Sequence, residues 1–245
     1  MKNSYLTLTL CLCLGSLLNI QAQCTQNADF TVEVGQTSSD LIVENGSIIF
    51  DNQTIIINGN FLVQDDLTFV NCDIYMGPNA SFSMTTVSYH ILTVTNTNIQ
   101  ACTDQLWFGI HYRFGFVKLT NSLVRDAFVA LDASGIDNQT KFEIESSQFL
   151  NNRTHLIVRN QIDLTSYVHS TDFDVQGNLL PPFQTLDAAH TAIDIQFVSN
   201  WTFGVDDENL TNEATNFKTG LQATNVDIDL IHTHFSNPPK IIDWM

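Results

Sequence analysis

The chain has 245 residues, enough for one large domain or two smaller ones, and a formal net charge of −17. Only 14% of the residues are Asp, Glu, Lys or Arg, against about 25% in an ordinary domain, while Asn, Thr, Ile, Val and Phe are abundant. This balance favours strands and turns over helices, and the acidic charge argues against nucleic acid and anionic membrane surfaces as partners.

The first 22 residues are typical of an export signal. Lys2 precedes an apolar run over residues 6–18, and a short polar end closes at Ala22. The run is too short for a membrane span, and no later segment is long and apolar enough to make one. We therefore expect a secreted protein without a membrane span, located extracellularly or on the cell surface, with the periplasm as the alternative. The expected division is a signal peptide (1–22), an N-terminal cap segment (23–44) and a repeat region (45–245).

One short pattern returns about every 25 residues through the middle of the chain. It reads apolar, any, apolar, any, Asn or Ser, small, any, apolar. The first half has the period of two of a strand with one buried face, and the Asn or Ser predicts a bend because Asn tolerates left-handed backbone angles. The last apolar residue of each copy lies 25, 25, 25 and 24 residues after the one before it, at Ile74, Ile99, Val124, Phe149 and Phe173.

A strand, a bend and a second strand cannot bury an apolar face alone, but stacked copies can. The repeat therefore predicts an all-β, single-stranded, right-handed parallel β-helix of seven or eight coils. Weaker copies are expected at 195–202 and 228–235, with insertions around Pro181-Pro182 and Asp206–Asn209. Residues 48–50 and 55–57 would form an earlier coil. A leucine-rich repeat would need regular Leu columns and a helical arm, and a β-sandwich would lack identity between columns.

Several segments resemble the right-handed parallel β-helix proteins exported by Bacteroidota. They are LTFVNCDIYMGPNASF (67–82), LTVTNTNIQAC (92–102), WFGI (107–110) and VKLTNSLVRDAFVAL (117–131). The resemblance covers residues 45 to 175 best, and it implies export and a β-helix without implying one activity. Many of those proteins carry a C-terminal sorting domain. None is recognisable here, which leaves a fragment of a longer array and export by the signal alone as two interpretations.

Three cysteines follow the signal, namely Cys24, Cys72 and Cys102. They match neither a disulfide framework nor a zinc spacing, and they allow one disulfide at most. Cys72 and Cys102 occupy different positions of the repeat, separated by up to about 16 Å of extended chain. We therefore expect no bridge between these two, unless a corner of the coil folds that distance up.

Pectin-lyase-like β-helices include lyases and glycoside hydrolases, whose chemistry needs carboxylates from neighbouring coils. Asp172 and Asp174 are weak catalytic candidates, since alternation around a buried Phe173 exposes two acids in any case. The position of Asp172 recurs in earlier coils as Gln148, Leu123, Asn98 and Asp73. The two acids of this column would therefore lie four coils apart, about 19 Å, which is too far to cooperate.

The acidic loop Asp206, Asp207 and Glu208 is a weak candidate for calcium, with a solvated loop as the alternative. His232 and His234 could suggest a metal, but His232 falls on the bend position of its copy. Trp201 falls in an outward column and is the weak candidate for stacking on a sugar. Trp107, among Leu, Phe and Ile neighbours, is expected to pack at a coil corner.

The leading hypothesis is a secreted or cell-surface structural module without catalytic activity. Its expected partner is an extracellular glycan or a cell-surface component. A polysaccharide lyase or glycoside hydrolase is the alternative. An acidic cluster beside Arg or Lys in a groove would favour the enzyme, and its absence would favour the module.

Overall fold

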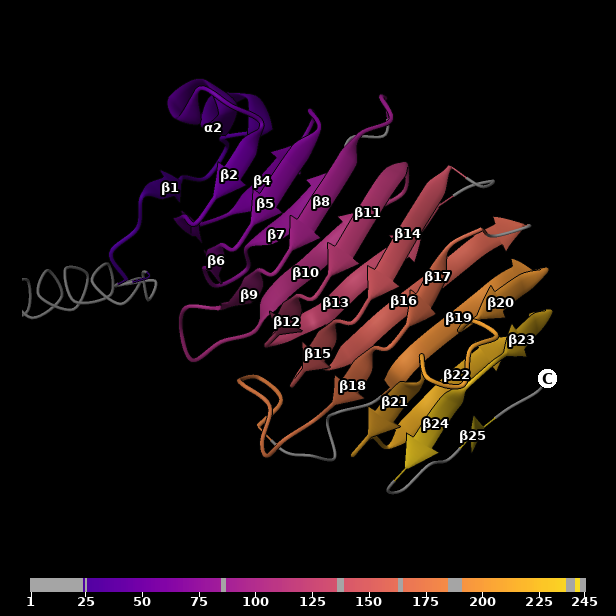
Figure 1. Cartoon of the computed structure of the whole chain (residues 1–245). Helices are drawn as coiled ribbons and strands as arrows, with labels where there is room; N and C mark the ends of the chain where they lie inside the picture. The colour runs from indigo at the N-terminus through magenta and orange to yellow at the C-terminus, as the bar shows by residue number, and fades with distance from the viewer. Residues whose placement is uncertain are drawn as a thin grey trace, which may run out of the picture.

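The computed structural model describes residues 24, 26–84, 87–135, 139–162, 165–184, 191–236 and 241–242, so the expected signal peptide lies outside the described residues. Parallel strands stack into a β-helix of about eight coils with a period of about 25 residues, as the repeat predicts (Figure 1). Each coil passes through three strands in turn, and equivalent strands of successive coils form three long sheets, named A, B and C here.

Sheet A consists of β1 (Phe30–Val32), β3 (Thr54–Ile57), β6 (Asp73–Met76), β9 (Asn98–Ala101), β12 (Leu123–Arg125), β15 (Gln148–Leu150), β18 (Asp172–Asp174), β21 (Asn212–Thr215) and β24 (Thr233–Ser236). Sheet B consists of β4 (Asn60–Val63), β7 (Ser81–Met84), β10 (Trp107–Tyr112), β13 (Ala127–Ser134), β16 (Thr154–Ile162), β19 (Thr191–Ser199), β22 (Thr219–Thr224) and β25 (Ile241–Ile242). Sheet C consists of β2 (Ile49–Asp51), β5 (Leu67–Val70), β8 (Ile91–Thr95), β11 (Gly115–Thr120), β14 (Thr140–Glu145) and β17 (Tyr167–His169). In the last two coils β20 (Trp201–Phe203) and β23 (Ile228–Leu230) pair with each other.

The core is made of apolar columns that run along the helix axis. The closing residues of the repeat pair directly from coil to coil, Ile74 with Ile99, Val124 with Phe149 and so on, and all are fully buried. Phe149 and Phe173 stack at 5.2 Å between ring centroids. Because strands of adjacent coils lie about 4.8 Å apart, each inward residue packs on its own counterparts, and a column of one residue class becomes a continuous core.

The bend position has the left-handed backbone that the Asn and Ser residues predict. The φ angle there is positive in five successive coils, at Asn71, Asn96, Asn121, Ser146 and Ser170. The small hydroxylic residue that follows links the coils by hydrogen bonds. Backbone N–H groups of Cys72, Thr97 and Ser122 donate to the side-chain hydroxyls of Thr97, Ser122 and Ser147 at 3.1, 3.3 and 3.2 Å. The column is therefore small and polar, because each side-chain hydroxyl accepts a hydrogen bond from the backbone of the coil before it.

One of the two weak copies of the repeat is wrong. The copy at 228–235 is correct, because β24 pairs with β21 and places Phe235 beside Ala214. The copy at 195–202 is not, because Ile195 lies in β19 of sheet B. The strands that continue the pattern in that coil are β20 and β21. The error arises because β19 runs into β20 with only Asn200 between them, so their joined alternation imitates one copy.

The segment that contains β1 and helix α2 (Ser38–Asn45) covers the N-terminal end of the stack. Strand β1 adds to the edge of sheet A beside β3, and α2 lies over the first coil (Figure 1). The Asp40 carboxylate accepts the Thr37 N–H at 2.8 Å at the start of the helix, and Leu41 packs into the core. Within the part of the chain that the structure describes, no helix is long and apolar enough to span a membrane.

The single disulfide that the cysteine count allows joins Cys24 to Cys102, and Cys72 is buried and free. The expected absence of a Cys72–Cys102 bridge is confirmed. The bond ties the N-terminal segment to the loop that connects β9 with β10.

Candidate functional site

The catalytic candidates of sheet A have a closer acidic neighbour than the repeat indicates. The register confirms that Asp73 and Asp172 are four coils apart. In the coil after Asp172, however, Glu213 occupies the same position, followed by His234. The sequence pattern does not reveal Glu213, because the wrong copy at 195–202 takes the place of the coil that contains it. Two carboxylates therefore stand on adjacent strands, about 4.8 Å apart at the backbone.

Asp172 and Asp174 differ in their affinity for protons. Burial, then the negative charges of Glu213 and Asp174, raise the pKa of Asp172. Burial acts to raise the pKa of Asp174 as well, but hydrogen bonds from Thr215, Gln176 and other donors outweigh it and lower that pKa.

Acid–base chemistry needs such a pair, but it also needs a place for the substrate. Asp172, Asp174 and Glu213 make no ion pair with Arg or Lys in the described ranges. They line neither of the two cavities described below. Asp172 therefore has the raised pKa that suits a general acid, but it borders neither of these two cavities.

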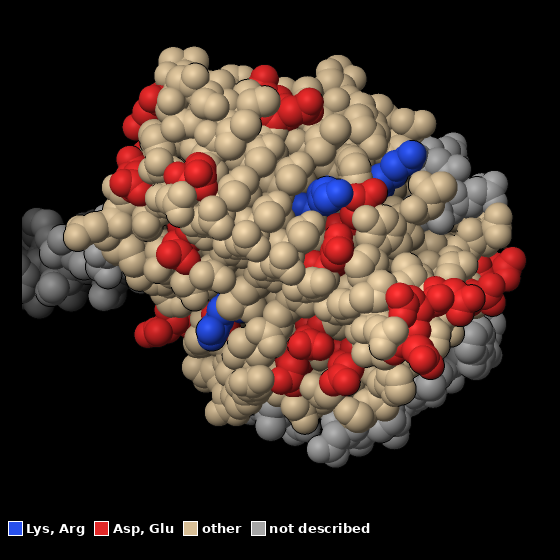
Figure 2. Space-filling view, in the orientation of Figure 1, with Lys and Arg blue, Asp and Glu red and all other residues tan. Residues whose placement is uncertain are grey.

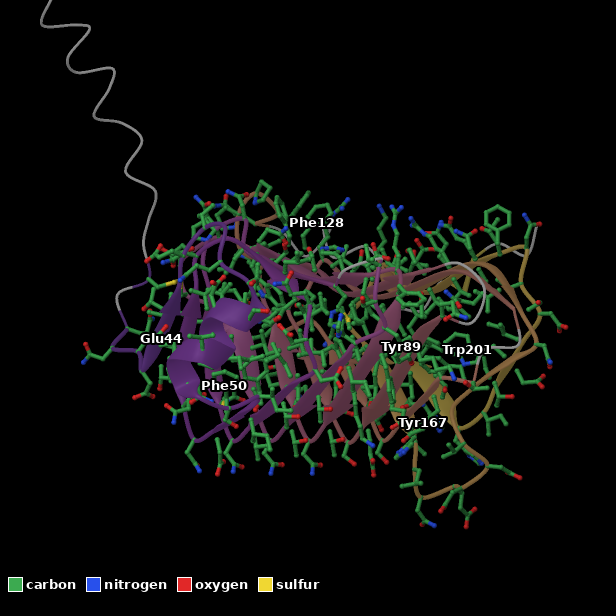
Figure 3. All side chains as sticks on the ribbon, turned by 90° about the horizontal axis from the view of Figure 1, so that it is seen from above. Glu44, Phe50, Tyr89, Phe128, Tyr167 and Trp201 are labelled. Carbon is green, nitrogen blue, oxygen red and sulfur yellow. A yellow bond between two sulfur atoms is a disulfide. The ribbon has the colours of Figure 1, made fainter. Side chains whose placement is uncertain are left out.

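The expectation that Trp201 faces outward is wrong. Its side chain is 2% exposed and lies within the coils, whereas Phe128 lies on their outer side (Figure 3). The Trp201 Nε1–H donates to the Ser166 carbonyl at 2.7 Å, and the ring meets Phe142 and Phe203 edge-on. Trp201 opens β20 as an inward residue, so it has no free face for a sugar. Trp107 is buried as expected, with its Nε1–H bonded to the Arg125 carbonyl at 2.8 Å.

The acidic loop Asp206–Glu208 follows β20 and is exposed. The Asp207 carboxylate accepts hydrogen bonds from the backbone and the side chain of Asn209, both at 2.9 Å, which lower the pKa of Asp207. His232 has a φ of 43°, as its bend position predicts. Among the residues that the structure describes, no group of three His, Cys, Asp or Glu side chains is arranged to hold a metal ion. Calcium binding at this loop stays a prediction.

A cleft lined by aromatic rings lies on the outer face of sheet B. Phe108 on β10 and Phe128 on β13 are neighbours in one outward column, and Arg153, just before β16, is the next member. The loop after β18 brings Phe183 beside them. The resulting aromatic cleft has a volume of about 360 Å³ and is lined by Asn79, Gln105, Leu106, Phe108, Phe128, Pro181, Pro182 and Phe183.

The rings of the aromatic cleft are held in place from several sides. Phe128 and Phe183 lie 5.6 Å apart between centroids, and the Arg153 guanidinium carbon lies 4.7 and 4.4 Å from these rings. The Leu106 N–H donates to the Pro181 carbonyl at 3.3 Å and joins the two loops that border the cleft. Phe108 is 47% exposed and offers the most accessible ring.

Gly109 allows β13 to come very close to β10 directly after the outward-facing Phe108. Its φ is +116°, and a Cβ at this position would lie 1.5 Å from the carbonyl oxygen of Val129. Only glycine accepts such a close approach of the next coil. The register between β10 and β13 shifts at this point, so Trp107 before the bulge and Ile110 after it both point inward.

A polar cluster lies farther along the same strands. The His111 ring contacts Asp132 at 3.4 Å through Nδ1 and the Phe108 carbonyl at 3.0 Å through Nε2, and the Ser134 hydroxyl donates to Asp132. One strand further, Arg159 donates to Asp194 at 2.9 Å. A second cavity of about 360 Å³ is lined by Met84, His111, Tyr112, Arg113, Asp132 and Ser134.

The sequence criterion for an enzyme is an acidic cluster beside Arg or Lys in a groove. The polar cluster meets this criterion only in part. Acids do lie beside arginine near a cavity. Burial acts to raise the pKa of Asp132, but hydrogen bonds from His111 and Ser134 and the nearby positive charges lower it overall. Ile157 separates Asp132 from Asp194 in their column, which puts the two acids two coils, or about 10 Å, apart. Because of this separation the cluster holds no adjacent pair of acids, and each carboxylate is already bound by donors.

The outer face of sheet B differs in charge from the rest of the molecule. Three of the four arginines in the chain lie in or directly beside its strands, namely Arg113, Arg153 and Arg159. The acids of its described strands are Asp132 and Asp194, and both are hydrogen-bonded. Elsewhere acids prevail, and Figure 2 shows them gathered over β20 and β23 without Lys or Arg among them. Comparison with known proteins adds no assignment, because no family model, curated protein or solved structure matches the chain.

Proposed function

We propose that the protein is a non-enzymatic, secreted or cell-surface β-helix that binds a glycan in the aromatic cleft. The observation that carries the proposal is a cavity of about 360 Å³ with three phenylalanine rings and the amides of Asn79 and Gln105 in or around its lining. Ligand sites are concave and mostly apolar, with a few polar groups that fix orientation. The C–H faces of a sugar suit the rings, and its hydroxyls suit the amides.

Three features support a location outside the cytoplasm. Residues 1–22 have the pattern of an export signal, and the segments quoted above resemble exported β-helix proteins of Bacteroidota. The Cys24–Cys102 disulfide agrees with this location, because disulfides persist in oxidising compartments.

A glycan array followed by titration tests the binding function. We expect Phe108→Ala to weaken binding about five- to thirtyfold, because a ring that stacks on a ligand contributes on the order of 1 to 2 kcal/mol. Phe197→Ala is the matched control, since Phe197 is 54% exposed on β19 and lies outside the cleft. Equal affinities of the two variants, or an array on which the wild-type protein binds nothing, would contradict the proposal.

A pectin-lyase-like polysaccharide lyase or glycoside hydrolase is the second candidate, and the Asp172–Glu213 pair is the observation that favours it. Release of reducing ends or unsaturated products from a panel of polysaccharides is the measurement. If this pair is catalytic, Asp172→Asn and Glu213→Gln each lower turnover at least a hundredfold. Asp73→Asn, at the same position four coils earlier, then retains full activity. Binding without turnover in the wild-type protein would reject the enzyme.

A further inference from the structure

We propose that the aromatic cleft selects glycans that carry an anionic group, a carboxylate or a sulfate, and that Arg153 recognises this group. The inference rests on the proposed glycan-binding function and adds to it the chemical class of the ligand. It also runs against the overall charge of −17, which by itself predicts repulsion of anions.

The position of Arg153 suits anion recognition. Its guanidinium is held against the rings of Phe128 and Phe183, both of which line the cleft. A guanidinium that stacks through its face keeps its N–H groups at the edge, where they can pair with two oxygens of a carboxylate or sulfate. The stacking also restricts the side chain before any ligand arrives, so less entropy is lost on binding.

Arg153 lacks the acidic partner that two of the other three arginines have. Arg125 pairs with Asp126 at 2.7 Å, and Arg159 pairs with Asp194 at 2.9 Å. Arg153 forms no ion pair within the ranges that the structure describes, and its Nε is buried without a hydrogen-bond partner. Acids outnumber bases 26 to 9 in this chain, so carboxylates are plentiful. A partly buried cation without one is an incomplete site that an anionic ligand would complete.

The surroundings of Arg153 allow an anion to approach. Arg113 and Arg159 lie on the same outer face of sheet B, and the two acids in its described strands are already bound by donors. At physiological ionic strength the field of an exposed charge is screened over about 8 Å. Arg153 is therefore the cation that acts in the cleft, because Arg113 and Arg159 lie five and six residues farther along their strands, about 16 to 20 Å away, and contribute as little there as the acids over β20 and β23.

The test compares ligands that differ in charge but not in backbone. Alginate oligosaccharides supply carboxylates, and carboxyl-reduced chondroitin sulfate supplies sulfates. Fully carboxyl-reduced and desulfated forms of both provide the neutral counterparts. Affinity is measured for the full chain by calorimetry. We expect the wild-type protein to bind at least one anionic form ten or more times more tightly than its neutral form, and the preferred form identifies the group.

Arg153→Met keeps an unbranched apolar stem over the rings but removes the charge. We expect it to abolish the preference for the anionic form while changing the affinity for the neutral form less than twofold. Arg153→Lys should restore part of the preference, because it keeps the charge without the planar fork. Lys141→Met, which removes one positive charge from sheet C, is the control and should behave like the wild-type protein. Thermal melting checks that each variant is folded.

The outcomes distinguish the anionic selectivity from the glycan-binding function on which it rests. Equal binding of anionic and neutral forms by the wild-type protein and by Arg153→Met overturns the anionic selectivity and leaves glycan binding intact. Failure of every form to bind, together with no effect of Phe108→Ala on any array ligand, overturns both.

Discussion

His155 is a fully buried residue whose two ring nitrogens have no hydrogen-bond partner among the residues that the structure describes. It lies among aromatic rings in the core, with centroid distances of 6.2, 6.0 and 4.7 Å to Phe149, Phe173 and Phe217. Burial lowers its pKa from the usual 6.5 to about 3, against a smaller opposite effect of the Asp174 charge. The folded protein therefore keeps His155 neutral at every pH above about 3.

This burial makes stability depend on pH. Below pH 6.5 the unfolded chain binds a proton at His155 that the folded protein does not, so stability falls as the pH decreases from about 6.5 to about 3. Between pH 7 and pH 4 the loss from this residue is on the order of 3 kcal/mol. Urea unfolding of the wild-type protein and of His155→Phe at both pH values measures it. The variant should lose about that much less, and identical losses would contradict the interpretation.

Among the elements, the loop between β9 and β10 links the disulfide to the aromatic cleft. Cys102 begins it, and Gln105 and Leu106 near its end line the cleft. The bond spans 78 residues of sequence, so in the chain-entropy description it removes several kcal/mol of freedom from the unfolded state. It also holds one wall of the cleft against the N-terminal segment.

Removing this bond should affect both stability and binding. We expect the double variant Cys24→Ser and Cys102→Ser to melt at a lower temperature and to bind the proposed glycan ligand several-fold more weakly, since Gln105 and Leu106 are no longer anchored. Calorimetric melting and titration measure the two effects. Cys72→Ser is the control, because Ser occupies the same column at Ser122 and Ser147. An unchanged affinity of the double variant would show that the cleft keeps its shape without the bond.

The three sheets differ in how well their strands can be predicted from sequence. Sheets A and C follow one another through a bend of nearly constant length, so their residues keep a fixed spacing and their columns are visible. Strands of sheet B range from 2 to 9 residues, and the bulge at Gly109 shifts the register within one of them. Because these strand lengths vary, equivalent residues of sheet B do not recur at a constant spacing, and a search for a fixed period does not find their columns. The repeat therefore predicts two strands per coil, where the structure has three.

The candidate site lies mainly on sheet B, whose strands the 25-residue repeat does not reveal. Phe108, Phe128 and Arg153 share a column of sheet B, and Phe183 comes from the loop after β18. The insertion around Pro181-Pro182 is the one signal that points toward the site, because insertions in repeat proteins gather on the binding face. The pairing of Asp172 with Glu213 was hidden by the wrong copy at 195–202. No pattern in a single sequence indicates which outward residues a distant loop will cover.

At the scale of the whole molecule, the β-helix separates its charge along and around its axis. Acids gather over β20 and β23 near the C-terminal end (Figure 2), while three arginines lie on the outer face of sheet B. A rigid stack of coils keeps these regions apart, because each strand holds its place by pairing with the coils on both sides. The strong net charge is therefore a poor guide to what one face of this protein attracts.

The bulge at Gly109 also separates the two cavities along the strands. It divides β10 into an aromatic part at Phe108 and a polar part at His111, and β13 is divided in the same way between Phe128 and Asp132. His111 lies three residues after Phe108 and Asp132 lies four residues after Phe128, so the two cavities share the same coils and lie about 10 to 13 Å apart along the strands. A chain molecule that occupied both would cross the axis of the β-helix at nearly a right angle, so longer ligands would wrap around the stack and not run along its length.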